Sequence, residues 1–329
     1  MDRNTIIGLA LIGLILVGYS IFTKPAREAQ MEETRRRDSI ARVDQIRALE
    51  AARQEPAPSA LLEGTSVVND SATIQQLSDE LGDFASGAIG VAEEVVVEND
   101  VMRLTFTTKG GRPYTVDLVQ YQTHDSLPLY LFNGDSTIFE LNFFAENRGI
   151  NTGELFFTPS VKKGSDDEGR EYQELTMNLK VSESSAISYI YRLYDGDYMI
   201  DFDIRLKGLD TYKTDRMEFN FNFYAPSQEK GYQNEAMYTT LYYKYHGGDV
   251  ESFKSRSKKE FETADITTGI KWIAYSHQFF STILIADESF MGANMSQHRF
   301  NEPGKYVRQY SSSIGLPMNR TAEQTIGMS

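Results

Sequence analysis

The chain has 329 residues, a length that predicts about two domains. Hydrophobic residues make up 40% and aromatic residues 12%, which is enough for a sizeable core. The net charge is -14; residues 24–54 contribute +2 and residues 1–23 are neutral, so residues 55–329 carry -16. An acidic globular part lacks a phosphate-neutralising surface, so no nucleic-acid partner is expected. The chain has no cysteine, which excludes disulfides and a thiol nucleophile and leaves the redox compartment open.

An apolar segment, Ile6–Phe22, runs for seventeen residues without a charge. As a helix it reaches roughly 25 Å, the short end of what a hydrocarbon core of about 30 Å requires. We therefore predict a membrane anchor within residues 1–23, and a cleaved signal peptide remains the alternative. Lys and Arg counts near the two ends place the C-terminal side in the cytoplasm, but a long following domain weakens such a count, so the residues leave the orientation open. The predicted anchor residues include Ile6, Leu9, Leu11, Leu14, Leu16 and Phe22.

Two polar segments follow the anchor. Residues 24–54 are rich in Ala, Arg and Glu, with acid-first pairs four residues apart such as Glu32 and Arg36, which predicts a helix standing in solvent. A partner-binding or lipid-surface helix is the alternative. Pro56 and Pro58 end this helix, and residues 55–90 indicate a flexible linker with one short helical candidate, Ile74–Leu81.

From residue 91 onward the hydrophobic period changes to two. Apolar side chains alternate with polar ones in several runs, for example Leu175 to Val181, Tyr198 to Leu206 and Met217 to Phe223, which predicts strands buried on one side. Asp195-Gly196-Asp197 separates two such runs and predicts a hairpin. Many strands with short turns indicate a mainly β, large antiparallel sandwich over residues 91–329.

The sandwich shows no motif for covalent chemistry. Its four histidines, His124, His246, His277 and His298, are scattered, and none stands in a metal-ligand spacing, so each is expected to be a surface or packed residue. Lys109-Gly110-Gly111 lacks the spacing of a phosphate loop and predicts a tight turn. We expect no enzyme activity, no metal and no cofactor.

Two aromatic stretches are candidates for a surface that binds a partner or a glycan. The residues concerned are Tyr242, Tyr243, Tyr245 and Trp272. Aromatic rings on an open sheet face stack on sugar rings or anchor a peptide, whereas strand alternation explains most of them as core.

Three collinear phrases carry a resemblance to a known family. They are Met1–Gly8 (MDRNTIIG), Phe106–Arg112 (FTTKGGR) and Lys271–Ala274 (KWIA) with Gln278–Phe280 (QFF) soon after. Together they resemble the YidC membrane protein insertase family of the YidC/Oxa/Alb superfamily, in its Bacteroidetes form, over the first transmembrane helix and the periplasmic domain.

The resemblance implies a cytoplasmic N-terminus, a single inner-membrane span in this chain and a periplasmic domain folded as a β-supersandwich similar to galactose mutarotase. Relatives insert and fold inner-membrane proteins, alone or with the Sec translocon, so the implied partners are the lipid bilayer, nascent membrane proteins and Sec components. The family's groove-forming helices follow the periplasmic domain, and this chain ends at Ser329, so the resemblance implies an N-terminal, apparently truncated portion. No insertase groove residue and no mutarotase catalytic set is assigned here. Alternatives are a membrane-tethered carbohydrate-binding or aldose-epimerase-like envelope domain and a plain structural envelope protein.

Overall fold

The structure, a computed structural model, describes residues 71–134, 137–212, 216–253, 259–319 and 321–329. The predicted anchor, the charged segment 24–54 and the first part of the predicted linker lie outside the described residues. Among the described residues, no helix combines the length and the apolar character needed to cross a membrane.

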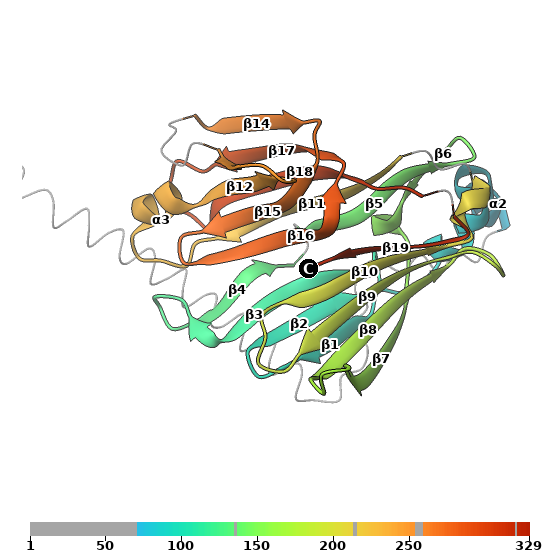
Figure 1. Cartoon of the computed structure of the whole chain (residues 1–329), viewed down its shortest axis with the longest axis horizontal. Helices are drawn as coiled ribbons and strands as arrows, with labels where there is room; N and C mark the ends of the chain where they lie inside the picture. Colours follow the sequence, from blue (N-terminus) through green and yellow to red (C-terminus); the bar gives the residue numbers. More distant parts are fainter. Residues whose placement is uncertain (1–70, 135–136, 213–215, 254–258, 320) are drawn as a thin grey trace, which may run out of the picture. The chain divides into compact units, whose positions relative to one another are not determined.

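The described chain forms antiparallel sheets of four, nine and six strands (Figure 1). The four-stranded sheet has the order β1 (Glu94–Glu98), β2 (Met102–Thr107), β3 (Arg112–Gln122), β4 (Pro128–Asn133). The nine-stranded sheet has the order β13 (Val250–Ser252), β12 (Thr240–Tyr245), β15 (Ile270–His277), β16 (Phe280–Phe290), β19 (Glu323–Met328), β10 (Ile200–Lys207), β9 (Ala186–Tyr194), β8 (Glu171–Lys180), β7 (Thr158–Ser165). The six-stranded sheet has the order β14 (Phe261–Ile266), β17 (Gly292–Arg299), β18 (Tyr306–Leu316), β11 (Met217–Pro226), β5 (Ile138–Ala145), β6 (Arg148–Asn151). The prediction of a mainly β, antiparallel sandwich is confirmed.

The helical elements are short. They are α2 (Ser71–Leu81), the 3-10 helices η1 (Gly82–Ala88), η2 (Thr152–Glu154) and η3 (Leu209–Tyr212), and α3 (Tyr232–Tyr238).

The core contains the inner face of β11, where every second residue is buried as the alternation predicted. Phe219, Phe221 and Phe223 point inward, and Phe219 meets Phe139 of β5 edge to face at a centroid distance of 4.7 Å. On the nine-stranded sheet, the rings of Tyr191 and Phe202 stack at 4.6 Å. The opposite sides of both large sheets carry polar residues together with exposed apolar side chains such as Phe144, Phe261 and Ile283.

Two predicted turns are confirmed. β9 and β10 pair in register around Asp195-Gly196-Asp197, where Gly196 has a φ of 74°. The Lys109-Gly110-Gly111 turn joins β2 to β3, and both glycines have positive φ. At Gly111 a Cβ atom would lie 2.8 Å from the Phe157 ring, so the close approach of the turn to the segment before β7 requires glycine there.

Residues 71–88, which the sequence assigned to the linker, pack on the sandwich. α2 contains the helical candidate Ile74–Leu81, and the following η1 buries Phe84, whose ring contacts Phe143 and Tyr212 at 5.6 and 5.7 Å. The segment is rich in Ser, Ala and Gly, which is typical of a linker. It is held to the sandwich by a single buried aromatic residue, Phe84, which its overall composition does not reveal.

The strand order does not follow the chain order. β19 pairs along its length with β10 and at one position with β16, so the last strand joins the two halves of the nine-stranded sheet (Figure 1). Alternation along each strand predicts its buried side but not its neighbour, so this arrangement was not predicted.

Candidate functional site

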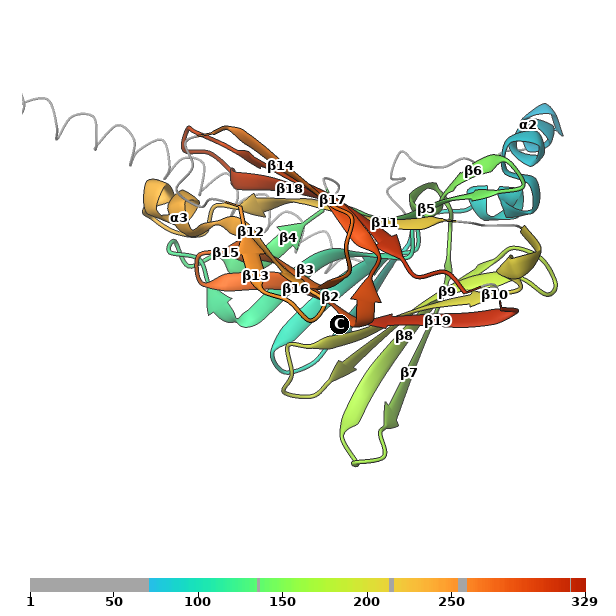
Figure 2. The same cartoon turned by 45° about the horizontal axis from the view of Figure 1, so that its top comes forward.

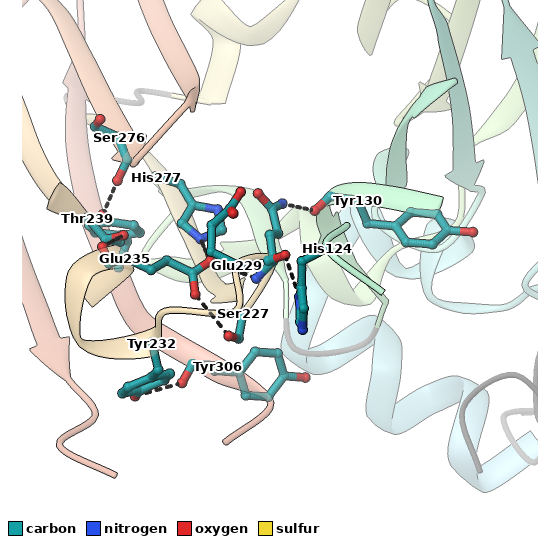
Figure 3. Close-up of polar contacts among 12 residues, drawn as sticks. His124, Tyr130, Ser227, Glu229, Tyr232, Glu235, Thr239, Ser276, His277 and Tyr306 are labelled. Carbon is teal, nitrogen blue, oxygen red and sulfur yellow. Dashed lines mark hydrogen bonds and ion pairs between the residues drawn. The ribbon is translucent and has the colours of Figure 1, made fainter. Parts of the chain in front are cut away.

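A buried carboxylate lies at the centre of a polar network beside α3 (Figure 3). Glu235 Oε1 accepts hydrogen bonds from the backbone N–H groups of Gln228 at 2.7 Å and Glu229 at 3.2 Å. The same oxygen lies 2.8 Å from His277 Nε2, at the end of β15, while Oε2 accepts from Ser227 Oγ at 2.9 Å. Glu235 is fully buried and His277 is 5% exposed. Because Glu235 Oε1 already accepts from two backbone N–H groups, it acts as an acceptor and His277 Nε2 is the donor.

This pair agrees with the expectation that each histidine is a surface or packed residue, since His277 is buried against Glu235. Glu235 and His277 are 42 residues apart in the chain, and only the packing of α3 against β15 joins them. No local spacing could have shown this contact. The carboxylate accepts four hydrogen bonds and is closed to solvent, which suits it to hold three chain segments together rather than to remove a proton from a substrate.

The network continues from the carboxylate toward the β3–β4 turn (Figure 3). The Gln228 carbonyl accepts from both the backbone N–H and Nδ1 of His124, at 3.1 and 3.0 Å. Gln228 Nε2 donates to the Tyr130 carbonyl at 2.8 Å. The segment before α3 therefore ties the four-stranded sheet to β15 through Glu235.

A second buried ion supports α3 from β18. Arg308, which is 2% exposed, donates from its guanidinium to the Ala236 carbonyl at 3.1 Å. Burial lowers the pKa of this guanidinium from its ordinary value, and the nearby Arg299 lowers it further.

The four aromatic residues predicted as a surface lie on β12 and β15 but divide between the two sides of the sheet. Tyr243 is 8% exposed, and its ring meets Tyr245 at 5.5 Å within the core. Burial raises the pKa of Tyr243 to about 12. Tyr242 and Trp272 are half-buried and alternate to the outer side, where Trp272 pairs with Lys244 across the strands. A role for Tyr242 and Trp272 in contacting a partner stays a prediction.

A row of charges crosses the outer side of the nine-stranded sheet. Glu174 of β8 lies 3.0 Å from Lys162 on β7 and 2.6 Å from Arg192 on β9, and its side chain is only 4% exposed. Burial raises the pKa of Glu174, but the hydrogen bonds from Arg192 and Lys162 outweigh burial and hold the pKa below its ordinary value. The row ties the edge strand β7 to the sheet.

A cleft of about 380 Å³ lies where the chain enters β1. Its lining includes Gly87, Gly90, Phe156, Asn178 and Lys180, from η1, the loop after it, the segment before β7, and β8. A Cβ atom at Gly90 would lie 2.5 Å from the Phe156 side chain, so glycine permits the close approach that shapes this cleft.

The fold and the network together define a mainly β, antiparallel sandwich domain whose buried ionic groups serve its architecture. The chain belongs to the YidC periplasmic domain family, whose sequence model matches residues 94–328. The match covers the sheets from β1 to β19.

Curated relatives agree with this family. The chain is 31% identical over 333 residues to the membrane protein insertase YidC of Parabacteroides distasonis and 30% identical over 331 residues to that of Bacteroides fragilis. Each alignment covers 100% of this chain and 51% and 50% of the relatives, respectively, so the chain spans about half the length of the curated relatives it matches.

Solved structures show a more distant likeness. A galactose mutarotase-like protein from Lactobacillus casei covers 72% of this chain and 99% of its own, with 10% sequence identity and a TM-score of 0.45. A GalM/aldose epimerase homologue from C. elegans gives 7% identity and a TM-score of 0.39. Likeness at this level says nothing about a shared activity.

Proposed function

We propose that this chain is the anchored periplasmic portion of a YidC-type membrane protein insertase, which assists the insertion and folding of inner-membrane proteins. The observation that carries the proposal is the family match over residues 94–328 together with relatives named membrane protein insertase YidC that align along the whole chain. Within that protein, the sandwich serves as a docking or scaffolding domain and acts by binding rather than by covalent chemistry.

The proposal includes a location and a set of partners. Residues 1–23 form an uncleaved anchor with the N-terminus in the cytoplasm, and the sandwich lies in the periplasm as a galactose mutarotase-like β-supersandwich. The partners are the lipid bilayer, nascent membrane proteins and components of the Sec translocon. Protease added to intact spheroplasts should digest the sandwich without detergent, although slowly because the domain is folded. Complete protection until detergent opens the membrane would contradict this orientation.

The function is tested by deletion from the full-length gene. In a strain that depends on an inducible copy, a version lacking residues 91–329 should insert a test inner-membrane protein less efficiently, as measured by protease protection of the newly made substrate. Unchanged insertion would instead favour a structural envelope role for the sandwich. Reading the gene beyond codon 329 provides a second test, because a natural stop codon there would contradict the insertase assignment.

A further inference from the structure

The outer face of the six-stranded sheet carries a feature that the insertase proposal does not use. β17, β18 and β11 lie side by side in this sheet, across the upper part of Figure 2. Their outward-pointing side chains are short amides and hydroxyls that align in two cross-strand rows, which we call the amide–hydroxyl face. One row is Ser296, Ser311 and Asn222, and the other is Asn294, Ser313 and Asn220.

The placement of these rows follows from the strand register. Asn220 pairs with Ser313, which pairs with Asn294; Asn222 pairs with Ser311, which pairs with Ser296. Directly opposite residues in antiparallel strands point to the same side of the sheet. Since Phe219 and Phe221 of β11 are buried in the core, the asparagines between them point outward.

The composition of this face differs from that of an ordinary solvated sheet. Charged residues make up 24% of the chain, yet all six members of the two rows are neutral. Long Lys and Glu side chains usually cover an exposed sheet face, whereas these short side chains leave it low and flat. Acidic residues border the face directly, since Asp265 stands opposite Asn294 and Glu140 stands opposite Asn220 at the two ends of one row. Glu218 lies beside the same row.

The polar groups are positioned by one another. Asn222 Oδ1 accepts from Ser311 Oγ at 2.8 Å and from the Ser312 backbone N–H at 2.9 Å. Ser313 Oγ donates to Glu218 at 2.9 Å. Asn220 Oδ1 is buried without a hydrogen-bond partner among the described residues, so a ligand hydroxyl reaches it only if this carboxamide turns outward.

Aromatic rings lie along one side of the face, in the next outward cross-strand row beyond Ser296, Ser311 and Asn222. Phe261 of β14 is 58% exposed and stands opposite His298 of β17. Tyr224, the next outward residue on β11 after Asn222, has its ring 6.1 Å from Phe300 and nearly parallel to it, and 5.0 Å from Tyr306. The His298 ring lies 4.8 Å from the Phe300 ring. An apolar ring platform therefore adjoins a field of neutral donors and acceptors.

We propose that the amide–hydroxyl face, with Phe261 at its side, binds a neutral oligosaccharide. A sugar ring presents hydroxyls that both donate and accept, which match carboxamide and hydroxyl side chains, and an apolar ring face, which stacks on an aromatic side chain. An anion finds no cationic group in the two rows and meets carboxylates at their ends, so a neutral sugar fits this face better than an anion does. The inference does not depend on the insertase proposal.

Binding is tested with the full chain purified in a detergent without a sugar headgroup, because a maltoside would compete. Isothermal titration calorimetry with maltohexaose, cellohexaose and chitohexaose should give saturable binding for at least one of them, and glycerol should give none. Asn220→Asp places a charge among the rows, and Phe261→Ala removes the exposed ring. Each should weaken binding at least tenfold.

Two matched control variants should bind within twofold of the wild type. Asn178→Asp makes the same change on the outer side of β8, where Asn178 accepts from Ser188. Phe279→Ala removes a ring that is 68% exposed at the β15–β16 turn. Phe261 lies on an edge strand, so its variant remains informative if Asn220→Asp fails to fold.

Three results would overturn the proposal. They are no binding of any of the three oligosaccharides at concentrations up to the solubility limit, equal weakening by the control variants, and self-association of the chain that Asn220→Asp abolishes while no sugar binds. The last result would identify a second copy of the chain as the occupant of this face.

Discussion

Replacing Glu235 with alanine removes a carboxylate that accepts four hydrogen bonds in a site closed to water. The donors left behind are two backbone N–H groups, the Ser227 hydroxyl and the His277 imidazole. Truncating one member of a buried pair costs about 3–5 kcal/mol, because its partner loses compensation without regaining water. Domains are stable by only about 5–15 kcal/mol, so the variant should lose about a fifth or more of its free energy of unfolding.

Glu235→Gln separates the loss of charge from the loss of shape. The glutamine carbonyl can occupy the Oε1 position, and its amide group can face Ser227, whose hydroxyl turns to accept. We therefore expect this variant to cost about 1–2 kcal/mol, the range for weakening charge-assisted hydrogen bonds while keeping the partners. A double-mutant cycle with His277→Phe should give a coupling energy of at least about 1 kcal/mol.

Urea denaturation followed by far-UV circular dichroism measures these losses. Glu154→Ala is the matched control, since that side chain is 74% exposed and its ion pair with Lys109 should contribute less than about 1 kcal/mol. The reasoning is refuted if Glu235→Ala costs no more than the control variant, or if Ala and Gln at this position are equally destabilising.

Three other predictions concern stability. The folded pKa of Glu174 lies below its ordinary value, so its carboxylate stabilises the fold above about pH 4.3 and ceases to do so as pH falls through the folded pKa. The difference in unfolding free energy between wild type and Glu174→Gln, measured by urea titration, should therefore shrink as pH falls through this window. A difference that does not depend on pH would contradict the ion-pair account. Gly111→Ala should lower the unfolding free energy by about 1–3 kcal/mol, since its φ is 61° and the added methyl group meets Phe157, and an unchanged melting temperature would disprove this steric conflict. Tyr243→Ala should lower the unfolding free energy by about 3–5 kcal/mol because it empties core volume, whereas Trp272→Ala should lower it by about 1 kcal/mol because Trp272 is only half-buried. Equal losses of stability in thermal denaturation would show that the buried and outer sides of β12 and β15 are wrongly assigned.

Local patterns in the sequence were sufficient to predict individual strands and their buried sides. The alternation through Met217, Phe219 and Phe221 predicted both β11 and its buried side, because the side-chain period of a strand is two and one face must leave water. The Asp195–Asp197 turn predicted the β9–β10 hairpin for a similarly local reason, since glycine accepts positive φ. Three short phrases also indicated the family, which the match over residues 94–328 confirmed.

Tertiary structure decided which strands become neighbours and what their side chains meet. Pairing places β19 between β16 and β10, brings Glu235 to His277, and aligns Asn220 with Ser313 and Asn294. Each of these contacts joins residues far apart in the chain, and hydrophobic alternation is the same for every partner a strand might have. Burial therefore follows from the sequence, whereas the buried network and the amide–hydroxyl face depend on register, which only the assembled sheets define.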